Sequence, residues 1–202
     1  MGSEMCIRDR TQRFRGHQHT DEMRLINFEN LDVGTADRID FNIFGTNDDN
    51  IITTSDGDDQ INARGGYNFV QTGGGQDIIT GGVGVDVVTG GADEDVFVTQ
   101  VGRGFMFIED FKQGEDVLRM VEGVTEGVDP IIKDYRDAWG DIRDHLIFNA
   151  GLDSWESEEV YYHAIDDFNA ASVIYKDGDL VAVIDGVSAD QLMISADMNA
   201  II

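Results

Sequence analysis

Acidic and amide side chains recur at one position of a short repeat in this chain. A nine-residue unit is written six times between Gly45 and Val98, without insertion or deletion. The copies are GTNDDNIIT (45–53), TSDGDDQIN (54–62), ARGGYNFVQ (63–71), TGGGQDIIT (72–80), GGVGVDVVT (81–89) and GGADEDVFV (90–98). Their sixth position reads Asn50, Asp59, Asn68, Asp77, Asp86 and Asp95, and their fourth is glycine in the middle four copies. Side-chain oxygens that follow a glycine-rich turn suit a hard cation, above all Ca²⁺.

The eighth position of the unit is apolar in every copy. Its residues are Ile52, Ile61, Val70, Ile79, Val88 and Phe97. A single repeat cannot bury such a residue alone, whereas stacked repeats bury a continuous core. The period therefore predicts an all-β solenoid, in which the repeat rather than helix propensity determines the fold.

These copies resemble the GGxGxDxUx nonapeptide of the RTX (hemolysin-type) family of calcium-binding secreted proteins, most closely in the last three copies. The resemblance implies a parallel β-roll like that of serralysin-like proteins, with two nonapeptides per coil and several Ca²⁺ ions between repeats eighteen residues apart. It also implies a set of metal ligands. They are Asn50, Asp59, Asn68, Asp77, Asp86, Asp95, Gly57, Gly73, Gly75, Gly82, Gly84, Gly91, Asp93, Asp110 and Asp116.

The implied coil places the sixth-position residues on two flanks. Asp59, Asp77 and Asp95 share one flank, while Asn50, Asn68 and Asp86 share the other. Replacing a carboxylate by an amide keeps an oxygen ligand but removes a charge, and ligand charge tunes calcium affinity. We therefore expect the Asp59/Asp77/Asp95 flank to bind calcium first.

The charge of the chain is strongly negative. Forty acidic residues against fourteen basic ones give a net charge of −26. Such a charge argues against nucleic acid or an anionic membrane surface as a partner. Much of it lies in the repeats and repels itself without a cation, so we expect cation binding and folding to be one event. No apolar run approaches the ~20 residues that span a bilayer.

The first part of the chain leads into the repeats. Residues 1–10 read as an expression leader followed by a translated sequencing adapter, so we expect the natural protein to begin further upstream. They hold the only cysteine, Cys6, and residues 11–23 form an aperiodic lead-in in which His17 and His19 are an incidental pair. The alternation in 24–44 predicts short strands that cap the first coil.

After the sixth copy the register slips by two residues. VGRGFMFIEDF (101–111) resembles the closing segment of RTX arrays, but Met106 stands where a calcium aspartate belongs. KQGEDVLRM (112–120) then restores a fragment of the repeat with Gly114, Asp116 and Leu118, and Asp110 is a second candidate ligand. We place the end of the β-roll domain, 24–128, shortly after this fragment.

The segment 129–170 has a different pattern. Asp129-Pro130 followed by apolar residues three or four apart predicts an amphipathic helix, and a second helix is predicted from about Ser154 to Phe168. Its aromatic residues fit a helix core better than a sugar-stacking platform. His145 and His163 also lie here, so a catalytic or metal role for this segment stays open.

The last segment, 171–202, predicts a β-hairpin cap. Val173–Lys176 and Leu180–Ile184 alternate around an Asp177-Gly178 turn. Gly186, Val187 and Leu192 resemble the ending of many RTX proteins, and the resemblance implies a type I secretion signal at the extreme C-terminus.

An apolar stripe is expected on the outside of the roll. Seventh-position side chains point outward because they flank the buried eighth in an extended strand. On one flank they are Ile51, Phe69 and Val87. Apolar stripes of this kind are usually covered. We expect the chain's own C-terminal segment to cover this one, and self-association through it is the alternative.

Catalytic motifs are missing from the sequence. Neither HExxH nor GxSxG occurs, so the chain contains neither a zinc-protease nor a lipase signature. The sequence thus favours a calcium-triggered folding module of a secreted, extracellular bacterial protein that supports type I secretion. Two alternatives remain open. One is a structural or adhesive surface element, and the other is a fragment of an enzyme whose site lies in 129–170 or upstream.

Overall fold

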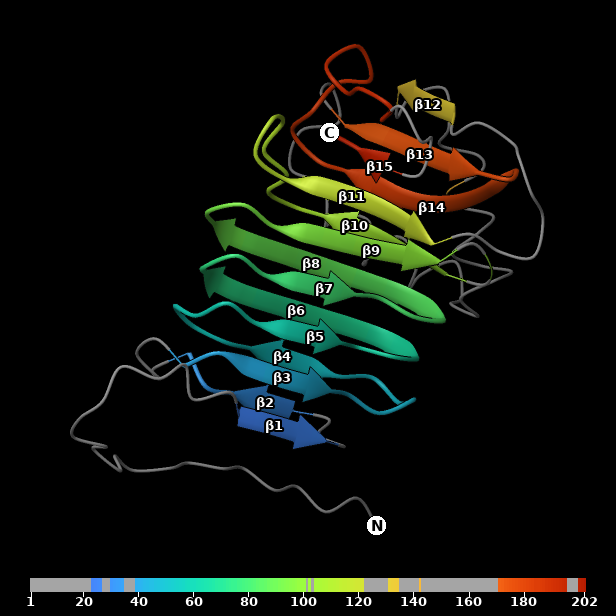
Figure 1. Cartoon of the computed structure of the whole chain (residues 1–202). Helices are drawn as coiled ribbons and strands as arrows, with labels where there is room; N and C mark the ends of the chain where they lie inside the picture. The colour runs from blue at the N-terminus through green and yellow to red at the C-terminus, as the bar shows by residue number, and fades with distance from the viewer. Residues whose placement is uncertain are drawn as a thin grey trace.

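Two β-sheets whose repeat strands pair in parallel form a solenoid, with successive coils stacked along one axis (Figure 1). The computed structural model describes residues 23–26, 30–34, 39–100, 102, 104–121, 131–134, 142, 171–195 and 200–202. The first sheet contains, in spatial order, β1 (Met23–Ile26), β3 (Phe41–Phe44), β5 (Gln60–Asn62), β7 (Ile78–Thr80), β9 (Val96–Gln100), β11 (Val117–Val121) and β15 (Ala200–Ile201). The second contains β12 (Ile131–Asp134), β13 (Ser172–Lys176), β14 (Asp179–Ile184), β10 (Gly104–Ile108), β8 (Gly84–Ala92), β6 (Gly66–Gly74), β4 (Ile51–Thr53) and β2 (Asn30–Asp32). The all-β solenoid predicted from the repeat is confirmed.

The strand register confirms that two nonapeptides make one coil. In the first sheet Ile61 pairs with Ile79, and Ile79 with Phe97. In the second sheet Ile52 pairs with Val70 in the same way. Every pair joins residues eighteen positions apart, because the chain visits each sheet once per two repeats.

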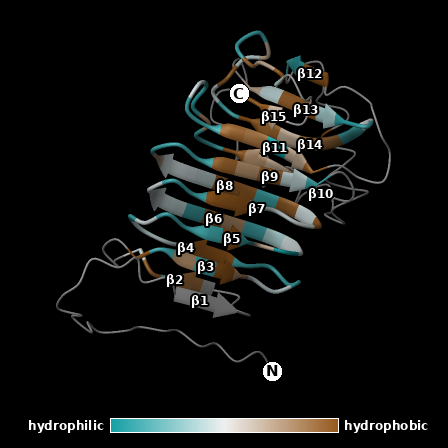
Figure 2. Cartoon of the chain, viewed as in Figure 1, coloured by the Kyte–Doolittle hydropathy of each residue, from teal (hydrophilic) through white to brown (hydrophobic). Residues whose placement is uncertain are grey.

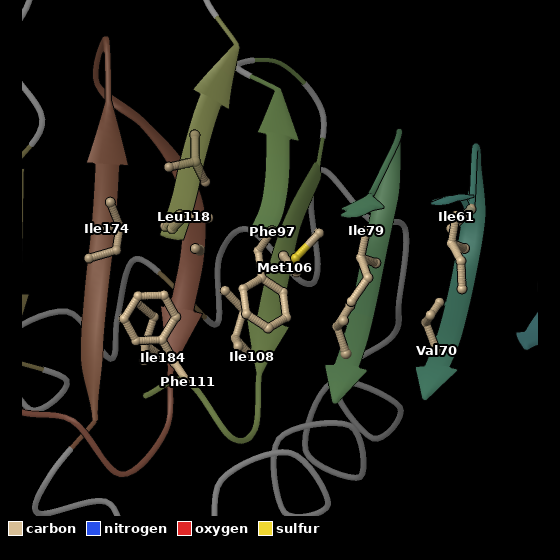
Figure 3. Close-up of a cluster of buried hydrophobic side chains, with 14 of the residues drawn as sticks. Ile61, Val70, Ile79, Phe97, Met106, Ile108, Phe111, Leu118, Ile174 and Ile184 are labelled. Atoms are coloured by element: carbon tan, nitrogen blue, oxygen red, sulfur yellow. The ribbon is translucent and has the colours of Figure 1, made fainter. Parts of the chain in front are cut away.

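The eighth-position residues form the core between the sheets. All six have relative exposures of 3% or less. They stack into one continuous apolar column, which Figure 3 shows from Ile61 to Ile184, and the apolar band along the strands is visible in Figure 2. Burying an aliphatic or aromatic side chain of this size contributes about 1.5–3 kcal/mol, so the column accounts for the stacking of short strands that would be unstable alone.

The predicted two-residue slip after the sixth copy is present in the second sheet. Gly104 of β10 pairs with Gly84 of β8, and Met106 pairs with Asp86. The next strand of the first sheet is displaced by one further residue, because Val117 pairs with Val96. The chain therefore continues the solenoid for one more coil beyond the regular array.

A β-hairpin closes the C-terminal end of the solenoid. β13 and β14 pair around Asp177 and Gly178, whose φ angles of 55° and 83° are the positive values of a tight hairpin turn. β14 then pairs in parallel with β10, and β15 pairs antiparallel with β11. The predicted hairpin and its capping position are thus confirmed.

The prediction of a helix directly after Asp129-Pro130 is wrong. Residues 131–134 form β12, which pairs antiparallel with β13. Ile131 and Ile132 are β-branched residues that suit a strand, and the open edge of β13 supplies the pairing that a local helical pattern cannot reveal. Of the rest of 129–170 only Ile142 is described. It has helical backbone geometry and is buried.

The outer apolar stripe of the second sheet is only partly covered. Val87 is buried in a second apolar cluster that also holds Ile142 and residues Val173 and Leu180 of the C-terminal hairpin. Ile51 and Phe69 are 53% and 38% exposed, so the expectation of a cover is wrong for these two residues. No helix in the described part of the chain is long and apolar enough to cross a membrane.

Candidate metal centre

The sixth-position side chains form two buried rows, one at each flank of the solenoid. Asp59, Asp77 and Asp95 precede strands of the first sheet, and we call them the acidic row. Asn50, Asn68 and Asp86 accompany strands of the second sheet, and we call them the amide row. All six side chains are at most 2% exposed. The predicted division into two flanks is confirmed.

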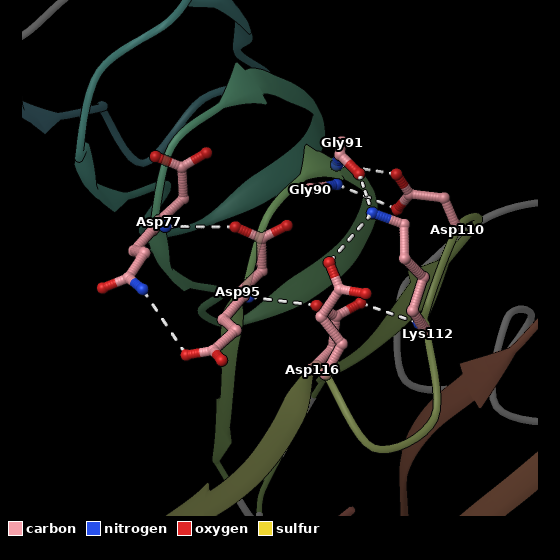
Figure 4. A network of polar contacts seen from close by, with 10 residues as sticks. Asp77, Gly90, Gly91, Asp95, Asp110, Lys112 and Asp116 are labelled. Carbon is pink, nitrogen blue, oxygen red and sulfur yellow. Dashed lines mark hydrogen bonds and ion pairs between the residues drawn. The ribbon is translucent and has the colours of Figure 1, made fainter.

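Backbone amides hold one carboxylate oxygen of each residue in the acidic row. The amide of Phe41 donates to Oδ1 of Asp59 over 2.7 Å. The amides of Asp59 and Asp77 donate to Oδ1 of Asp77 and Asp95 over 2.8 and 3.0 Å. Figure 4 shows the Asp77 to Asp95 step. Each carboxylate is therefore fixed by the coil that precedes it.

The second carboxylate oxygen is unsatisfied at two positions of the acidic row. Among the described residues, Oδ2 of Asp59 and Oδ2 of Asp77 are buried and have no hydrogen-bond partner, because the nearby hydroxyls of Thr54 and Thr72 donate to the carbonyls of Thr72 and Gly90. A buried ionised oxygen without a partner is strongly unfavourable unless a cation compensates it. These two oxygens mark where a ligand of opposite charge would stabilise the acidic row most.

Burial weakens the acidity of the whole acidic row. It is the main cause that raises the pKa of Asp59 to about 6, of Asp77 to about 8 and of Asp95 to about 7. Asp77 lies between the other two, and their negative charges raise its pKa further, while nearby hydrogen bonds partly offset the rise. The row thus resists full ionisation in the absence of a cation.

The amide row satisfies itself through side-chain hydrogen bonds. Nδ2 of Asn50 donates to Oδ1 of Asn68 over 2.6 Å, and Nδ2 of Asn68 donates to Oδ1 of Asp86 over 2.6 Å. Oδ2 of Asp86 accepts the amide of Gly82 over 3.0 Å. Burial raises the pKa of Asp86 to about 6, and its hydrogen bonds to Asn68 and Gly82 oppose the rise. This flank is held by hydrogen bonds between protein groups.

The turns of the solenoid expose backbone carbonyls to the neighbouring coil. A Cβ added to Gly75, where φ is +111°, would lie 2.3 Å from the carbonyl oxygen of Gly57. A Cβ added to Gly91, where φ is +108°, would lie 1.9 Å from the carbonyl oxygen of Gly73. Only glycine permits both the positive φ and the close approach. The turns of the acidic row are therefore lined by carbonyl oxygens.

Carbonyl-lined turns beside unpartnered carboxylate oxygens fit a hard cation. Ca²⁺ takes six to eight oxygen ligands and accepts both carboxylates and backbone carbonyls. In the described residues no three acidic, histidine or cysteine side chains converge on one point. A cation in these turns would accordingly depend on carbonyl oxygens for most of its ligands, with one carboxylate from each coil.

Three of the predicted ligands lie outside the two regular rows. Asp116 continues the acidic row, because the amide of Asp95 donates to its Oδ1 over 3.0 Å. Asp110 lies beside the row and accepts the amides of Gly90 and Gly91. Asp93 is exposed in its turn, with a φ of 76°.

Two further sequence predictions concern residues around these rows. Met106 occupies the amide-row register opposite Asp86 and is 1% exposed, so this row ends in a thioether. His145 and His163, for which the sequence left a catalytic or metal role open, lie outside the described residues.

Sequence reasoning missed Lys112, which contacts the last turn of the acidic row. Aligning FKQGEDVLR with the repeat would have placed it at the second, glycine position.

Fold and site together define a class of protein. A parallel solenoid with an Asp row at its turns, carbonyl-lined glycines and an apolar eighth position is a cation-binding β-roll. Comparison with known families agrees with this class. Residues 42–70 and 68–97 match the RTX calcium-binding nonapeptide repeat, in four copies. Residues 42–97 therefore carry the RTX calcium-binding nonapeptide repeat. No curated protein and no solved structure matches the chain.

Proposed function

We propose that this chain is the calcium-dependent folding module of a secreted bacterial protein. In this proposal Ca²⁺ enters the turns of the acidic row and completes the packing of coil on coil outside the cell. The observation that carries it is the pair of buried, unpartnered Oδ2 atoms of Asp59 and Asp77. The glycine carbonyls of the same turns supply the remaining oxygens.

The proposed ligands differ between the two flanks. The acidic row presents unsatisfied carboxylate oxygens, whereas the amide row already pairs Asn50 with Asn68 and Asn68 with Asp86. Calcium binding to the amide row has to break these hydrogen bonds and gains only the charge of Asp86. We therefore assign the acidic row as the first to fill.

Repulsion between carboxylates makes folding of the chain depend on calcium. With a net charge of −26, the chain gains little from folding while its buried carboxylates stay unneutralised. Extracellular calcium modules bind at ~10⁻⁴–10⁻³ M, which lies far above the calcium level inside a cell. The chain would then remain extended for type I secretion and fold after export. In this scheme 24–128 is the calcium-binding roll and 171–202 its cap with the secretion signal.

A calcium titration tests this function. Far-UV circular dichroism and thermal melting are followed as Ca²⁺ is added, with Mg²⁺ as the control and a chelator to reverse the effect. We expect a cooperative gain of β signal and a higher Tm with Ca²⁺ alone, because Mg²⁺ releases its water reluctantly and demands a strict octahedron. Equal folding and equal Tm with and without Ca²⁺ would show that the repeats act only as a scaffold.

A second candidate function follows from the exposed part of the outer stripe. Ile51 and Phe69 lie side by side on neighbouring strands, and Tyr67 packs edge-on against Phe69 with ring centroids 4.9 Å apart. Such a stripe suits a structural or adhesive element that assembles through its own copies. Sedimentation of the wild type and of Phe69→Asp across a concentration series tests it. Association that survives the substitution rules out this surface.

A further inference from the structure

The last turn of the acidic row departs from the repeat at one position. Gly73 and Gly91 stand opposite each other at the second position of their copies. The pairing of Val117 with Val96 places Lys112 opposite Gly91 in the following coil. A lysine therefore replaces the glycine at the turn that closes the row.

The side chain of Lys112 reaches back into this turn. Its Nζ donates to the carbonyl oxygen of Gly91 over 2.6 Å and lies 3.6 Å from Oε1 of Glu115 (Figure 4). Asp110 accepts the amides of Gly90 and Gly91 over 2.9 and 2.7 Å. A turn carbonyl of the kind that would coordinate a cation is thus already bound by an ammonium group.

The carboxylate at this end of the row is also satisfied by the protein. Oδ1 of Asp116 accepts the amide of Asp95 over 3.0 Å, and its Oδ2 accepts the amide of Lys112 over 2.7 Å. By contrast, Asp59 and Asp77 each keep one buried oxygen without a partner. Lys112 therefore makes both contacts: its backbone amide donates to the Asp116 carboxylate, and its ammonium group donates to the Gly91 carbonyl.

The charge of Lys112 acts on the neighbouring acids as well. Burial raises the pKa of Asp95 and of Asp116, and the Lys112 ammonium opposes the rise in both. Asp110 adds a further negative charge beside them. The charges of Asp95, Asp110 and Asp116 thus act on one another near this turn without converging on one point, and the Lys112 ammonium is the positive charge that opposes them.

We propose that the Lys112 ammonium is a tethered cation that replaces Ca²⁺ in the last turn of the acidic row. Calcium is then bound in the preceding turns, around Asp59 and Asp77, while the final coil closes without metal. This inference rests on the proposed calcium function for the preceding turns. The contacts of Lys112 itself do not depend on that function.

Two substitutions of Lys112 test the proposal from opposite directions. Lys112→Gly restores the glycine of the repeat and vacates the turn, so calorimetric titration should count one more Ca²⁺ per chain than in the wild type. Lys112→Met keeps an apolar stem but removes the charge, so its Tm in a chelator should fall below that of the wild type. Lys112→Arg keeps the charge and should behave as the wild type in both measurements.

Arg119→Gln is the matched control for the loss of one positive charge. Arg119 is exposed on β11, two residues beyond Val117, and among the described contacts its side chain makes none to the turn carbonyls. It should leave both the ion count and the chelator Tm unchanged. An unchanged ion count in Lys112→Gly together with an unchanged chelator Tm in Lys112→Met would overturn the proposal.

The outcomes also separate this proposal from the function on which it rests. If the wild type binds no Ca²⁺, the calcium function fails, and the chelator Tm of Lys112→Met alone decides whether Lys112 closes the turn. If the wild type binds Ca²⁺ but Lys112→Met melts like the wild type in chelator, the tethered cation is refuted and the calcium function stands.

Discussion

Replacing Asp77 by asparagine should stabilise the calcium-free protein and destabilise the calcium-bound protein. Asp77 is 0% exposed, and burial together with the charges of Asp59 and Asp95 raises its pKa to about 8 from an ordinary value of 3.8. Without calcium this carboxyl group is therefore protonated in the folded state at pH 7 but ionised in the unfolded chain. Folding has to reverse that ionisation.

The size of the effect follows from the pKa difference. An acid whose pKa is higher in the folded state than in the unfolded state does not destabilise the fold below the unfolded-state pKa. Above that value the free energy of unfolding falls as pH rises, until the folded-state pKa is reached. From 3.8 to pH 7 the interval is about 3 units, and each unit corresponds to about 1.4 kcal/mol, which sets an upper bound of about 4 kcal/mol. At pH 5 the bound is about 2 kcal/mol.

Asp77→Asn removes this penalty while keeping the shape. The introduced amide oxygen can still accept the amide of Asp59, and the amide row shows that an Nδ2 group can donate to the next carboxylate, as Asn68 does to Asp86. In chelator the variant should be more stable than the wild type, by more at pH 7 than at pH 5. In saturating Ca²⁺ it should be less stable, because a charged ligand is lost.

Urea unfolding in chelator and in Ca²⁺, at pH 5 and pH 7, measures both effects. Asp48→Asn is the matched control, because Asp48 lies in a turn before the amide row and its side chain is exposed. For that variant, the stability difference from the wild type should have the same sign in chelator and in Ca²⁺ and should not depend on pH. If Asp77→Asn is destabilised equally with and without Ca²⁺, the buried charge carries no penalty and the reasoning is refuted.

Three further predictions concern the ligands, the turns and the core. Calcium titration should show a larger loss of affinity for Asp77→Ala than for Asn68→Ala, and equal losses would refute the difference between the rows. Gly75→Ala should lower the free energy of unfolding by more than about 2 kcal/mol, since its Cβ meets the Gly57 carbonyl, whereas Gly114→Ala, with open space around it and a φ of +80°, should lower it by about 1 kcal/mol. Ile79→Ala should lower it by about 2–5 kcal/mol in urea unfolding, and a smaller change would mean that the core column collapses around the gap.

Much of the solenoid could be predicted because the repeat is local. The period of nine places an apolar residue at the eighth position of each copy, and a strand that buries it needs only its copy eighteen residues away. The two rows of sixth-position side chains follow from the same spacing, as does the interruption at Met106. The Asp177-Gly178 turn was equally readable, since its positive φ angles require residues of this kind.

Features that depend on contacts between segments distant in the sequence could not be predicted in this way. β12 forms at 131–134 because β13, some forty residues later, offers an open edge, and this pairing overrides a helical pattern. Val87 is buried in an apolar cluster that joins it to Phe107 of β10 and Val183 of β14 and includes Ile142, whereas Phe69, one strand further from the hairpin, is exposed. A local pattern contains no information about where such a cover ends.

The sequence by itself determined the period, the two rows and the kind of ion that would suit them. Only the tertiary structure decided which oxygens are left without a partner and which turn is closed by Lys112. The physical reason is that satisfaction of a buried polar group depends on the geometry of several coils at once. A shift of three residues in the last coil, from eighteen to the twenty-one that separate Val96 and Val117, puts a lysine opposite Gly91, where the two preceding coils pair Gly73 with Gly91.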